Sequence, residues 1–394
     1  MQLNFKPLLW AAFGLLVVAC NRPPAKPAEP PAEQVSISGT LVDSSNRPIV
    51  GAAILIDGAQ VGTTTGTGGF AIKHKADPAR LPVSFTAGGY VGTTRIFDLP
   101  KTGELATSPT VLLARAAPTV LQAERGGRVT FGDGTLLVPP NAFVDGRGRP
   151  VTGPVKVSVT AFDVGDPKAI RRAPGDFRAK TADGSDIRLQ SYGMFDLAVT
   201  DPAGKALSVA KGVQLPFTVR VPERLARQAS KTAGLYSLEP KTGLWVAEGE
   251  LTQTEPLVYS GAISRTGTWN ADNPYEVTCI TVRVVRLDFT TQTNVPVDNA
   301  QVTATGITYG SVSTGQSNAN GLVCLLVKRN EQIQISAWKQ VGTSTWMSPT
   351  EPVVQTPDVQ SDATACGTDV CPLVAEVVVD QLVGMLAPEP GDRR

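Results

Sequence analysis

The chain has 394 residues, of which 36 are lysine or arginine and 35 are aspartate or glutamate, so its formal net charge is +1. A balance this close to zero excludes the long-range electrostatic attraction on which non-specific nucleic-acid binding depends. Glycine (38 residues) and proline (31 residues) are frequent, and short β-branched runs recur between them. This pattern is typical of all-β domains with many turns, so we expect an all-β chain without a nucleic-acid partner.

The first 19 residues have the features of an export signal. Lys6 is their only charged residue, and the apolar run from Leu8 to Ala19 is too short to cross a bilayer as a helix. The run ends in LLVVAC, and small residues followed by a cysteine resemble the lipobox of bacterial lipoproteins. The resemblance implies that Cys20 is lipidated, becomes the first mature residue and attaches the protein to a membrane. An ordinary signal peptide with a chance cysteine is the alternative.

Residues 20–34 are predicted to be a tether. After the cysteine the sequence reads NRPPAKPAEPPAEQ, and its five prolines favour an extended polyproline II conformation spanning roughly 40 Å. The residue after the cysteine is Asn21 and not an aspartate. In this respect the sequence resembles lipoproteins that are sorted to an outer membrane. The resemblance implies an exported protein anchored in the bacterial cell envelope, on the periplasmic or the surface face of that membrane.

Two stretches of the chain, residues 39–72 and 284–325, form an internal repeat. Each reads as a strand, a polar turn, a Pro-Ile/Val-x-x-Ala segment, a second strand and a Thr/Ser/Gly-rich link into a third. In this alignment Pro48, Ala52, Gly69 and Phe70 correspond to Pro296, Ala300, Gly321 and Leu322. Proline fixes φ at the turn and glycine supplies a positive φ before the third strand. Phe70 and Leu322 are therefore predicted to enter the core.

The repeat resembles the carboxypeptidase-regulatory-like, or transthyretin-like, β-sandwich. That resemblance implies one such module at residues 35–116 and a second, disulfide-bearing one at residues 275–382, whose last strand is predicted at 373–380. Residues 383–394 are expected to form a flexible tail.

A larger β domain is predicted between the two modules, at residues 117–274. Val155, Val157 and Val159 alternate with polar residues, as half-buried strands do, and residues 215–221 repeat the pattern; only residues 222–231 suggest a short helix. The string GG-V-F-x-DG-L-VPPNAF resembles the β domain of ankyrins and netrin receptors. The order of PGDF, LQSYGMFDLAVTDPAGKAL, TGLWVAEG and TWNADNP resembles cartilage intermediate layer protein-type modules and bacterial lipoprotein relatives, which implies extracellular binding or a matrix role.

Four cysteines remain once Cys20 is lipidated: Cys279, Cys324, Cys366 and Cys371. An even number in an exported chain predicts two disulfides. Of the three pairings we favour Cys366–Cys371, five residues apart, with Cys279–Cys324, each of which lies in a predicted strand. A zinc site is the alternative. It is disfavoured because the sequence has only one CxxxxC spacing, and because an exported protein meets oxidising conditions that disfavour the free thiolates zinc requires. We expect no bound metal and no cofactor.

The chain offers few groups for catalysis. His74 is its only histidine, which removes Ser-His-Asp, Cys-His and HExxH sites unless His74 is the base. It lies between two lysines after a predicted strand, which is typical of a strand end exposed to solvent. The pairs Asp163/Asp166, Asp183/Asp186 and Asn270/Asp272 lie in predicted loops, where such residues form turns or bind calcium. We predict no catalytic residue and no enzyme; a hydrolase that uses acids alone is the least favoured alternative.

Trp338 and Trp346, in the segment WKQVGTSTW, flank one predicted hairpin and are the candidate ligand-stacking side chains. Packing in a core or interface is the alternative for both. We expect a non-catalytic cell-envelope lipoprotein that acts as a binding, adhesion or scaffolding module, with an envelope protein or a glycan as its partner. Carbohydrate binding through exposed aromatic side chains is the alternative function.

Overall fold

The computed structural model describes residues 34–77, 80–100, 103–181, 184–342, 344–368 and 370–381. Strands dominate this part of the chain, beside three short 3-10 helices, which confirms the all-β prediction. No helix within these residues is long and apolar enough to cross a membrane. The predicted signal peptide, Cys20, the tether up to residue 33 and the predicted tail lie outside the described residues.

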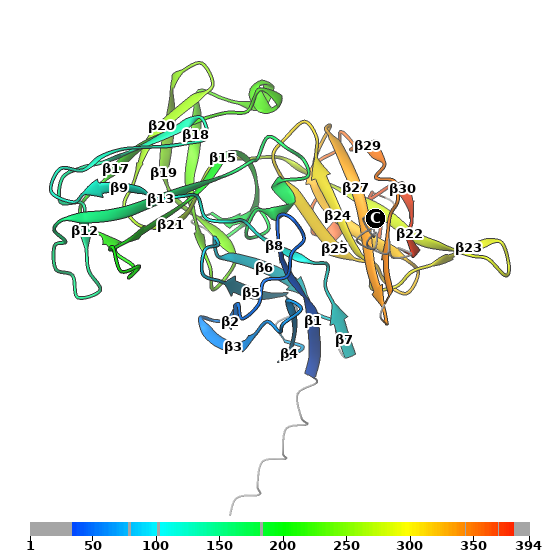
Figure 1. Ribbon diagram of the computed structural model, residues 1–394. Helices are drawn as coiled ribbons and strands as arrows, with labels where there is room; N and C mark the ends of the chain where they lie inside the picture. Colours follow the sequence, from blue (N-terminus) through cyan, green and yellow to red (C-terminus); the bar gives the residue numbers. More distant parts are fainter. Residues whose placement is uncertain are drawn as a thin grey trace, which may run out of the picture. The chain divides into compact units, whose positions relative to one another are not determined.

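The first eight strands form two sheets around one core (Figure 1). One sheet has the order β4-β1-β7, with β8 also paired to β1, and the other has the order β3-β2-β5-β6. Alternate residues of β1, among them Val35, Ile37 and Leu41, point into the core, as the pleat of a strand requires. The bounds are β1 Gln34–Asp43, β2 Ala53–Ile56, β3 Ala59–Thr63, β4 Gly69–Lys75, β5 Arg80–Thr86, β6 Thr93–Asp98, β7 Gly103–Ala106 and β8 Thr110–Leu112.

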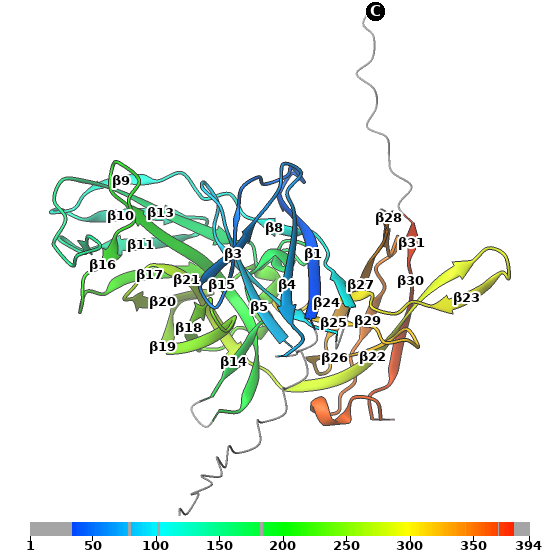
Figure 2. The ribbon, with the colours of Figure 1, turned by 90° about the horizontal axis from the view of Figure 1, so that it is seen from below.

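Residues 277–381 also form two sheets around one core. One has the order β23-β22-β26 with β30 beside β22, and the other has the order β25-β24-β27-β28-β31 with β29 beside β27. Figure 2 shows the β22–β23 hairpin projecting beyond its sheet, and Phe289 in its turn is 77% exposed. The bounds are β22 Val277–Asp288, β23 Thr293–Pro296, β24 Gln301–Gly306, β25 Val312–Gln316, β26 Leu322–Lys328, β27 Gln332–Val341, β28 Ser344–Met347, β29 Val353–Gln355, η3 Ala363–Ala365, β30 Leu373–Val378 and β31 Asp380–Gln381.

The internal repeat is confirmed, but its third strand is shifted by one residue. In the first copy, Gly68 has a φ of 72°, and its carbonyl accepts a hydrogen bond from the Leu41 amide at 2.8 Å. In the second copy, Gly321 has a φ of 73°, and its carbonyl accepts one from the Val284 amide at 2.7 Å. Gly68, and not Gly69, is therefore the counterpart of Gly321.

The shift decides which side chains enter the core. Phe70 is buried as predicted, whereas Leu322 is only half-buried and Val323 takes the core position. The prediction for Leu322 was wrong because a one-residue slip moves a side chain to the other face of its strand.

The proline-to-alanine part of the repeat holds without a shift. The Ala52 amide donates to Thr64 Oγ1 at 2.9 Å, and the Ala300 amide donates to Ser317 Oγ at 2.9 Å. Each hydroxyl in turn donates to the backbone carbonyl three residues before its alanine. Both copies thus use the same buried hydroxyl to hold the turn against the next strand.

Between these two strand sets lies one curved sheet of eleven strands. Its order is β10-β11-β17-β20-β19-β18-β21-β15-β13-β9, with β14 beside β15 and β19, and a bridge between Gln122 and Gly126 brings the two ends together. Strands β12 and β16 form a separate pair. The bounds are β9 Thr119–Gln122, β10 Gly127–Phe131, β11 Gly134–Val138, β12 Phe143–Val144, β13 Pro154–Phe162, η1 Ile170–Arg172, β14 Arg178–Lys180, β15 Asp186–Thr200, β16 Ser208–Val209, β17 Leu215–Arg220, η2 Glu223–Gln228, β18 Thr232–Glu239, β19 Leu244–Glu255, β20 Val258–Ile263 and β21 Gly267–Pro274.

Strand β13 is buried more completely than its alternating pattern predicts. Its three valines are buried as expected, but Ser158 and Thr160 on the other face are buried too. Thr160 Oγ1 accepts a hydrogen bond from the Ala116 amide at 2.9 Å, so the segment that enters the domain covers this face. The helical prediction at 222–231 corresponds to the short 3-10 helix η2.

Asn270 and Asp272 do not lie in a loop, as predicted, but inside strand β21, where both are fully buried. Asn270 Nδ2 donates to Asp272 Oδ2 at 2.8 Å, and Ser191 Oγ donates to Asn270 Oδ1 at 2.5 Å. Asp272 Oδ1 has no partner among the described residues. Burial raises the pKa of Asp272 well above its ordinary value, because the charged form is not solvated there.

Replacing Asp272 by asparagine is expected to stabilise the protein at pH 7.5 and to have little effect at pH 4. An unfolded aspartate ionises near pH 4, whereas the folded Asp272 keeps its proton to a higher pH. Stability of the natural protein is therefore complete below about pH 4 and falls as the pH rises towards the raised pKa, by about 1.4 kcal/mol per unit. Urea unfolding of both proteins at the two pH values measures the difference, with the exposed Asp133→Asn as control. An equal difference at both pH values would contradict the assignment.

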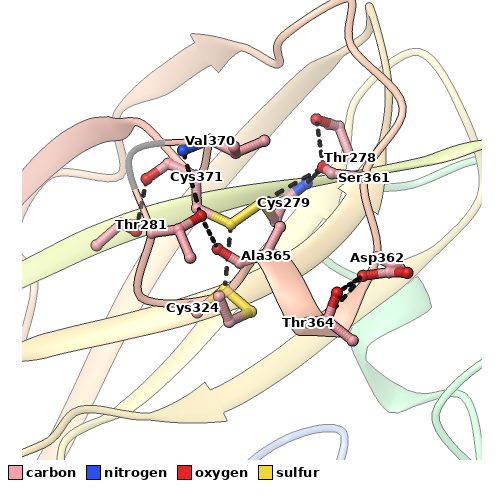
Figure 3. Close-up of a disulfide and its surroundings, with 12 residues drawn as sticks. Thr278, Cys279, Thr281, Cys324, Ser361, Asp362, Thr364, Ala365, Val370 and Cys371 are labelled. Carbon is pink, nitrogen blue, oxygen red and sulfur yellow. Dashed lines mark hydrogen bonds between the residues drawn. A yellow bond between two sulfur atoms is a disulfide. The ribbon is translucent and has the colours of Figure 1, made fainter.

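Two disulfides are present, as predicted, but the favoured pairing was wrong. The bonds are Cys279–Cys371 and Cys324–Cys366, both in the last strand set. Cys279 and Cys324 do lie on neighbouring strands, but Cys324 is opposite Thr281, so the two cysteines are offset by two residues. The loop before β30 instead brings Cys371 to Cys279 (Figure 3), and the same loop carries Cys366 to Cys324.

The two disulfides touch each other. Cys324 Sγ lies 3.8 Å from Cys371 Sγ, and Ser361 Oγ donates to Cys279 Sγ at 3.3 Å (Figure 3). In the part of the chain that the structure describes, Cys324, Cys366 and Cys371 form the one group of three or more metal-binding side chains close enough to share an ion. All three are in disulfides, so their sulfur atoms are not thiolate ligands.

Candidate functional site

A cavity of about 620 Å³ lies where three parts of the folded unit meet. Strands β6 and β8 line one side, the segment around η1 lines another, and the outer face of the sheet of β24, β25, β27 and β28 lines the third. Small-molecule sites in proteins measure about 300 to 1,000 Å³, and the volume of this cavity falls within that range.

The sheet wall of the cavity contains Trp338, one of the two predicted stacking side chains. Met347 is directly opposite Trp338 on the neighbouring strand and Gln301 is opposite it on the other side, so the three side chains form a row on one face. Trp338 is half-buried and Met347 is 41% exposed. The row gives the cavity an aromatic surface beside an amide group.

Trp346 lies on the opposite face of the same hairpin. It is opposite Lys339, the neighbour of Trp338, and successive residues of a strand point to opposite faces. Trp346 packs against the module's core, and the Arg286 guanidinium lies 5.5 Å from its ring centre. The two tryptophans therefore do not form a single stacking platform, and only Trp338 faces the cavity.

The η1 segment contributes positive charge. Ile170 is buried in the central core and fixes the segment, which turns the neighbouring Arg171 and Arg172 outwards to the cavity. Arg171 binds both carboxylate oxygens of Glu351 at 2.9 Å and donates to Thr305 Oγ1 at 2.8 Å. This bidentate pair joins the η1 segment to the last strand set.

Two other arginines on the cavity wall have no acidic partner among the described residues. Arg95 donates to the Ala173 carbonyl at 2.9 Å, and burial of its guanidinium lowers its pKa to about 10, so it stays cationic at neutral pH. Arg172 is half-buried and likewise makes no ion pair with a described residue. The two carboxylates of the lining, Asp176 and Glu351, are already paired with Arg80 and Arg171. The cavity therefore has a surplus of positive charge.

A second polar network joins β15 and η2 to the last strand set. Lys328 Nζ donates to Gln190 Oε1 at 2.8 Å and to Gln228 Oε1 at 2.7 Å, and lies 3.8 Å from Glu331. Burial lowers the pKa of Lys328. Gln228 also donates to Glu331, so every member of the network is hydrogen-bonded.

A further cavity of about 580 Å³ lies beside β13 and β15. Its charged groups include Arg115 and the buried Asp196, which form an ion pair at 3.1 Å. Burial raises the pKa of Asp196, and Arg115 opposes that rise. Because these two charges compensate each other, this cavity has fewer charged groups available to a ligand than the first cavity has.

The other chemistry-bearing residues lie apart from the cavity. His74 is half-buried in β4, and its Nδ1 bonds to the Lys75 carbonyl at 2.8 Å. Asp163 Oδ1 accepts the amides of Gly165 and Asp166, as a turn-forming aspartate does. Asp186 pairs with Arg178 and Lys180, and its predicted partner at position 183 lies outside the described residues.

Sequence reasoning found Trp338 but missed the arginines. Arg171 and Arg172 stand in a stretch with no strand period, and Arg95 reads as an ordinary residue of β6. The adjacent pair of arginines before Ala-Pro-Gly could have indicated a cluster of positive charge. The sequence does not indicate which of these arginines forms an ion pair with a carboxylate.

No protein-family model matches the chain. Cartilage intermediate layer protein 2 of Mus musculus is 33% identical over 217 residues, 52% of this chain and 18% of that protein. Cartilage intermediate layer protein 1 of Homo sapiens is 28% identical over 209 residues, 50% of this chain and 17% of that protein. A major pilin subunit of Bacillus cereus aligns with 88% of this chain and 100% of the pilin at 10% identity, but its TM-score of 0.19 supports no argument. About half of this chain is thus similar to less than a fifth of the cartilage intermediate layer proteins.

Proposed function

We propose that this protein is a non-catalytic binding module of the bacterial cell envelope, anchored by lipid on Cys20. The cavity carries the proposal, because its walls combine an aromatic ring, hydroxyl and amide groups and two arginines without an acidic partner among the described residues, as binding sites do. The two disulfides support export, since disulfides persist in oxidising compartments. Similarity to proteins named for the cartilage intermediate layer agrees with a binding or scaffolding role outside the cell.

The chemistry of the cavity favours binding over catalysis. Arginine does not exchange its proton near neutral pH, so Arg95 and Arg172 suit charge recognition better than acid–base work. Asp176 and Glu351 each accept hydrogen bonds from an arginine. A hydrolase that uses only carboxyl groups needs two of them free to act as general acid and as nucleophile or general base.

Replacing Cys20 by serine tests the anchor. Because serine has no thiol to lipidate, the variant is expected to leave the membrane fraction and appear with the soluble proteins, whereas the natural protein stays with membranes. Lys26→Ala, in the predicted tether, keeps the cysteine and serves as the matched control. Fractionation of cells that express each form measures the effect. A serine variant that still sediments with membranes would disprove the lipid anchor.

Protease treatment of intact cells separates adhesion from internal scaffolding. Loss of the full-length protein, while a periplasmic control survives, would favour capture of an external partner. Protection until the outer membrane is broken would favour a scaffold within the envelope.

A further inference from the structure

We propose that the cavity beside Trp338 binds a segment of an acidic oligosaccharide, with Trp338 stacked on a sugar ring and Arg172 and Arg95 bound to its carboxylate. The inference rests on the proposed binding function and names the ligand class of that same site. The two sides of the cavity offer different chemistry.

The aromatic side suits the face of a sugar ring. Trp338 faces the cavity beside Met347, and an indole has a flat apolar body that packs against the C–H face of a pyranose. Gln301 lies next to Trp338 on the neighbouring strand and also lines the cavity, so its amide is a candidate partner for the hydroxyls of a stacked ring. Gln301 Oε1 already accepts the Ser108 amide at 3.0 Å, so its orientation is fixed.

Hydroxyl-bearing side chains surround this surface. They bond sugar hydroxyls as both donors and acceptors; those on the sheet wall are Thr303, Thr314, Ser336 and Thr345. Asp176 also lines the cavity, and its buried Oδ1 has no hydrogen-bond partner within the described chain. That oxygen is closed off from solvent as well as unpaired, so the hydroxyl groups of the sheet wall, and not Asp176, supply the polar contacts of the proposal.

The opposite side requires a negative charge. Arg95 and Arg172 are cations removed in part from water, without a described carboxylate partner. A guanidinium binds a planar carboxylate through two parallel hydrogen bonds, the arrangement that Arg171 and Glu351 show on the same wall. A uronic acid provides both the ring and the carboxylate in one residue. A neutral sugar would leave these cations unpaired.

Calorimetry on the full-length protein, solubilised from membranes in detergent, tests the proposal. The probes are trisaccharides of galacturonate and of mannuronate, each compared with the neutral trisaccharide of the same sugar and linkage. At least one acidic probe is expected to bind about tenfold or more tightly than its neutral counterpart, because a charge-assisted contact is lost in the latter. Absence of binding by both acidic probes, or equal binding of acidic and neutral ones, would overturn the proposal.

Variants place the binding in the cavity. Trp338→Ala and Arg172→Ala are each expected to weaken binding of the acidic probe about tenfold or more. Trp338→Phe keeps a ring and is expected to retain most of the affinity, which guards against a folding defect in the alanine variant. Arg283→Ala removes an exposed arginine outside the cavity and serves as the matched control.

Each result decides the proposal separately from the envelope function. Binding unaffected by both alanine variants, or weakened equally by Arg283→Ala, would place the probe on the general surface and overturn it. Release of the Cys20→Ser variant from membranes would meanwhile leave the proposed function standing, because that test does not involve the ligand.

Discussion

Replacing Cys279 and Cys371 together by alanine is expected to lower the free energy of unfolding by about 4 to 5 kcal/mol. The Cys324–Cys366 bond lies inside residues 279–371 and stays closed in this variant, so Cys279–Cys371 closes a loop of about 50 residues in the unfolded chain; in the chain-entropy model the stabilisation grows with that loop. Both cysteines are also buried, so the variant loses packing around the two sulfur atoms. Urea unfolding of the two proteins under oxidising conditions measures the loss.

The second disulfide provides the matched control. Cys324–Cys366 closes 42 residues, and both of its cysteines are only half-buried, so the double alanine variant is expected to lose less stability. Replacing both partners of one bond leaves the other intact and avoids a free thiol 3.8 Å from a disulfide sulfur, which would exchange with it. An equal or larger loss for the Cys324/Cys366 variant would contradict the ranking.

Replacing Gly321 by alanine, or Gly68 in the first copy of the repeat, is expected to cost about 3 kcal/mol or more. A Cβ at Gly321 would lie 2.4 Å from the Val284 carbonyl oxygen, and one at Gly68 would lie 2.5 Å from the Leu41 oxygen. Both contacts are with backbone, which cannot move aside without disturbing the strand pairing. The left-handed conformation adds about 1 to 2 kcal/mol for any residue with a side chain.

Two other glycines separate the clash from the backbone conformation. Gly342 and Gly51 have φ angles of 58° and 68°, but a Cβ at either would meet no atom within 4 Å. Alanine at these positions is therefore expected to cost only the conformational part, about 1 to 2 kcal/mol. Thermal unfolding of the four variants provides the comparison. If Gly321→Ala lowered the stability no more than Gly342→Ala does, the close approach of Gly321 to the Val284 carbonyl would not require a glycine, and this explanation of the repeat would be wrong.

The all-β architecture could be predicted because its signals are local. Alternating residues, turn prolines and the Pro-x-x-x-Ala segment each depend on a few neighbours, and the buried hydroxyls of Thr64 and Ser317 confirm that both copies use them alike. The third strand was misaligned because residues 66–69 contain three glycines, and spacing alone does not indicate which one takes the positive φ.

Longer-range features could not be predicted in the same way. The disulfide pairing depends on the strand register, which places Cys324 opposite Thr281, and on a loop that crosses both strands. The faces of Trp338 and Trp346 depend on the register of one hairpin, and a slip of one residue would reverse them. The surplus charge at Arg95 and Arg172 appears only when residues about 80 positions apart meet at one cavity.

Hydroxyl-radical footprinting in intact cells tests most directly the claim that a ligand of the cell envelope occupies the cavity. Trp338 and Met347 line the cavity, and both side chains oxidise readily when solvent reaches them. Phe289, 77% exposed at the tip of the β22–β23 hairpin, calibrates the radical dose. Relative to Phe289, both cavity residues should be oxidised less in cells than in the purified full-length protein. Equal oxidation in the two settings would contradict the claim.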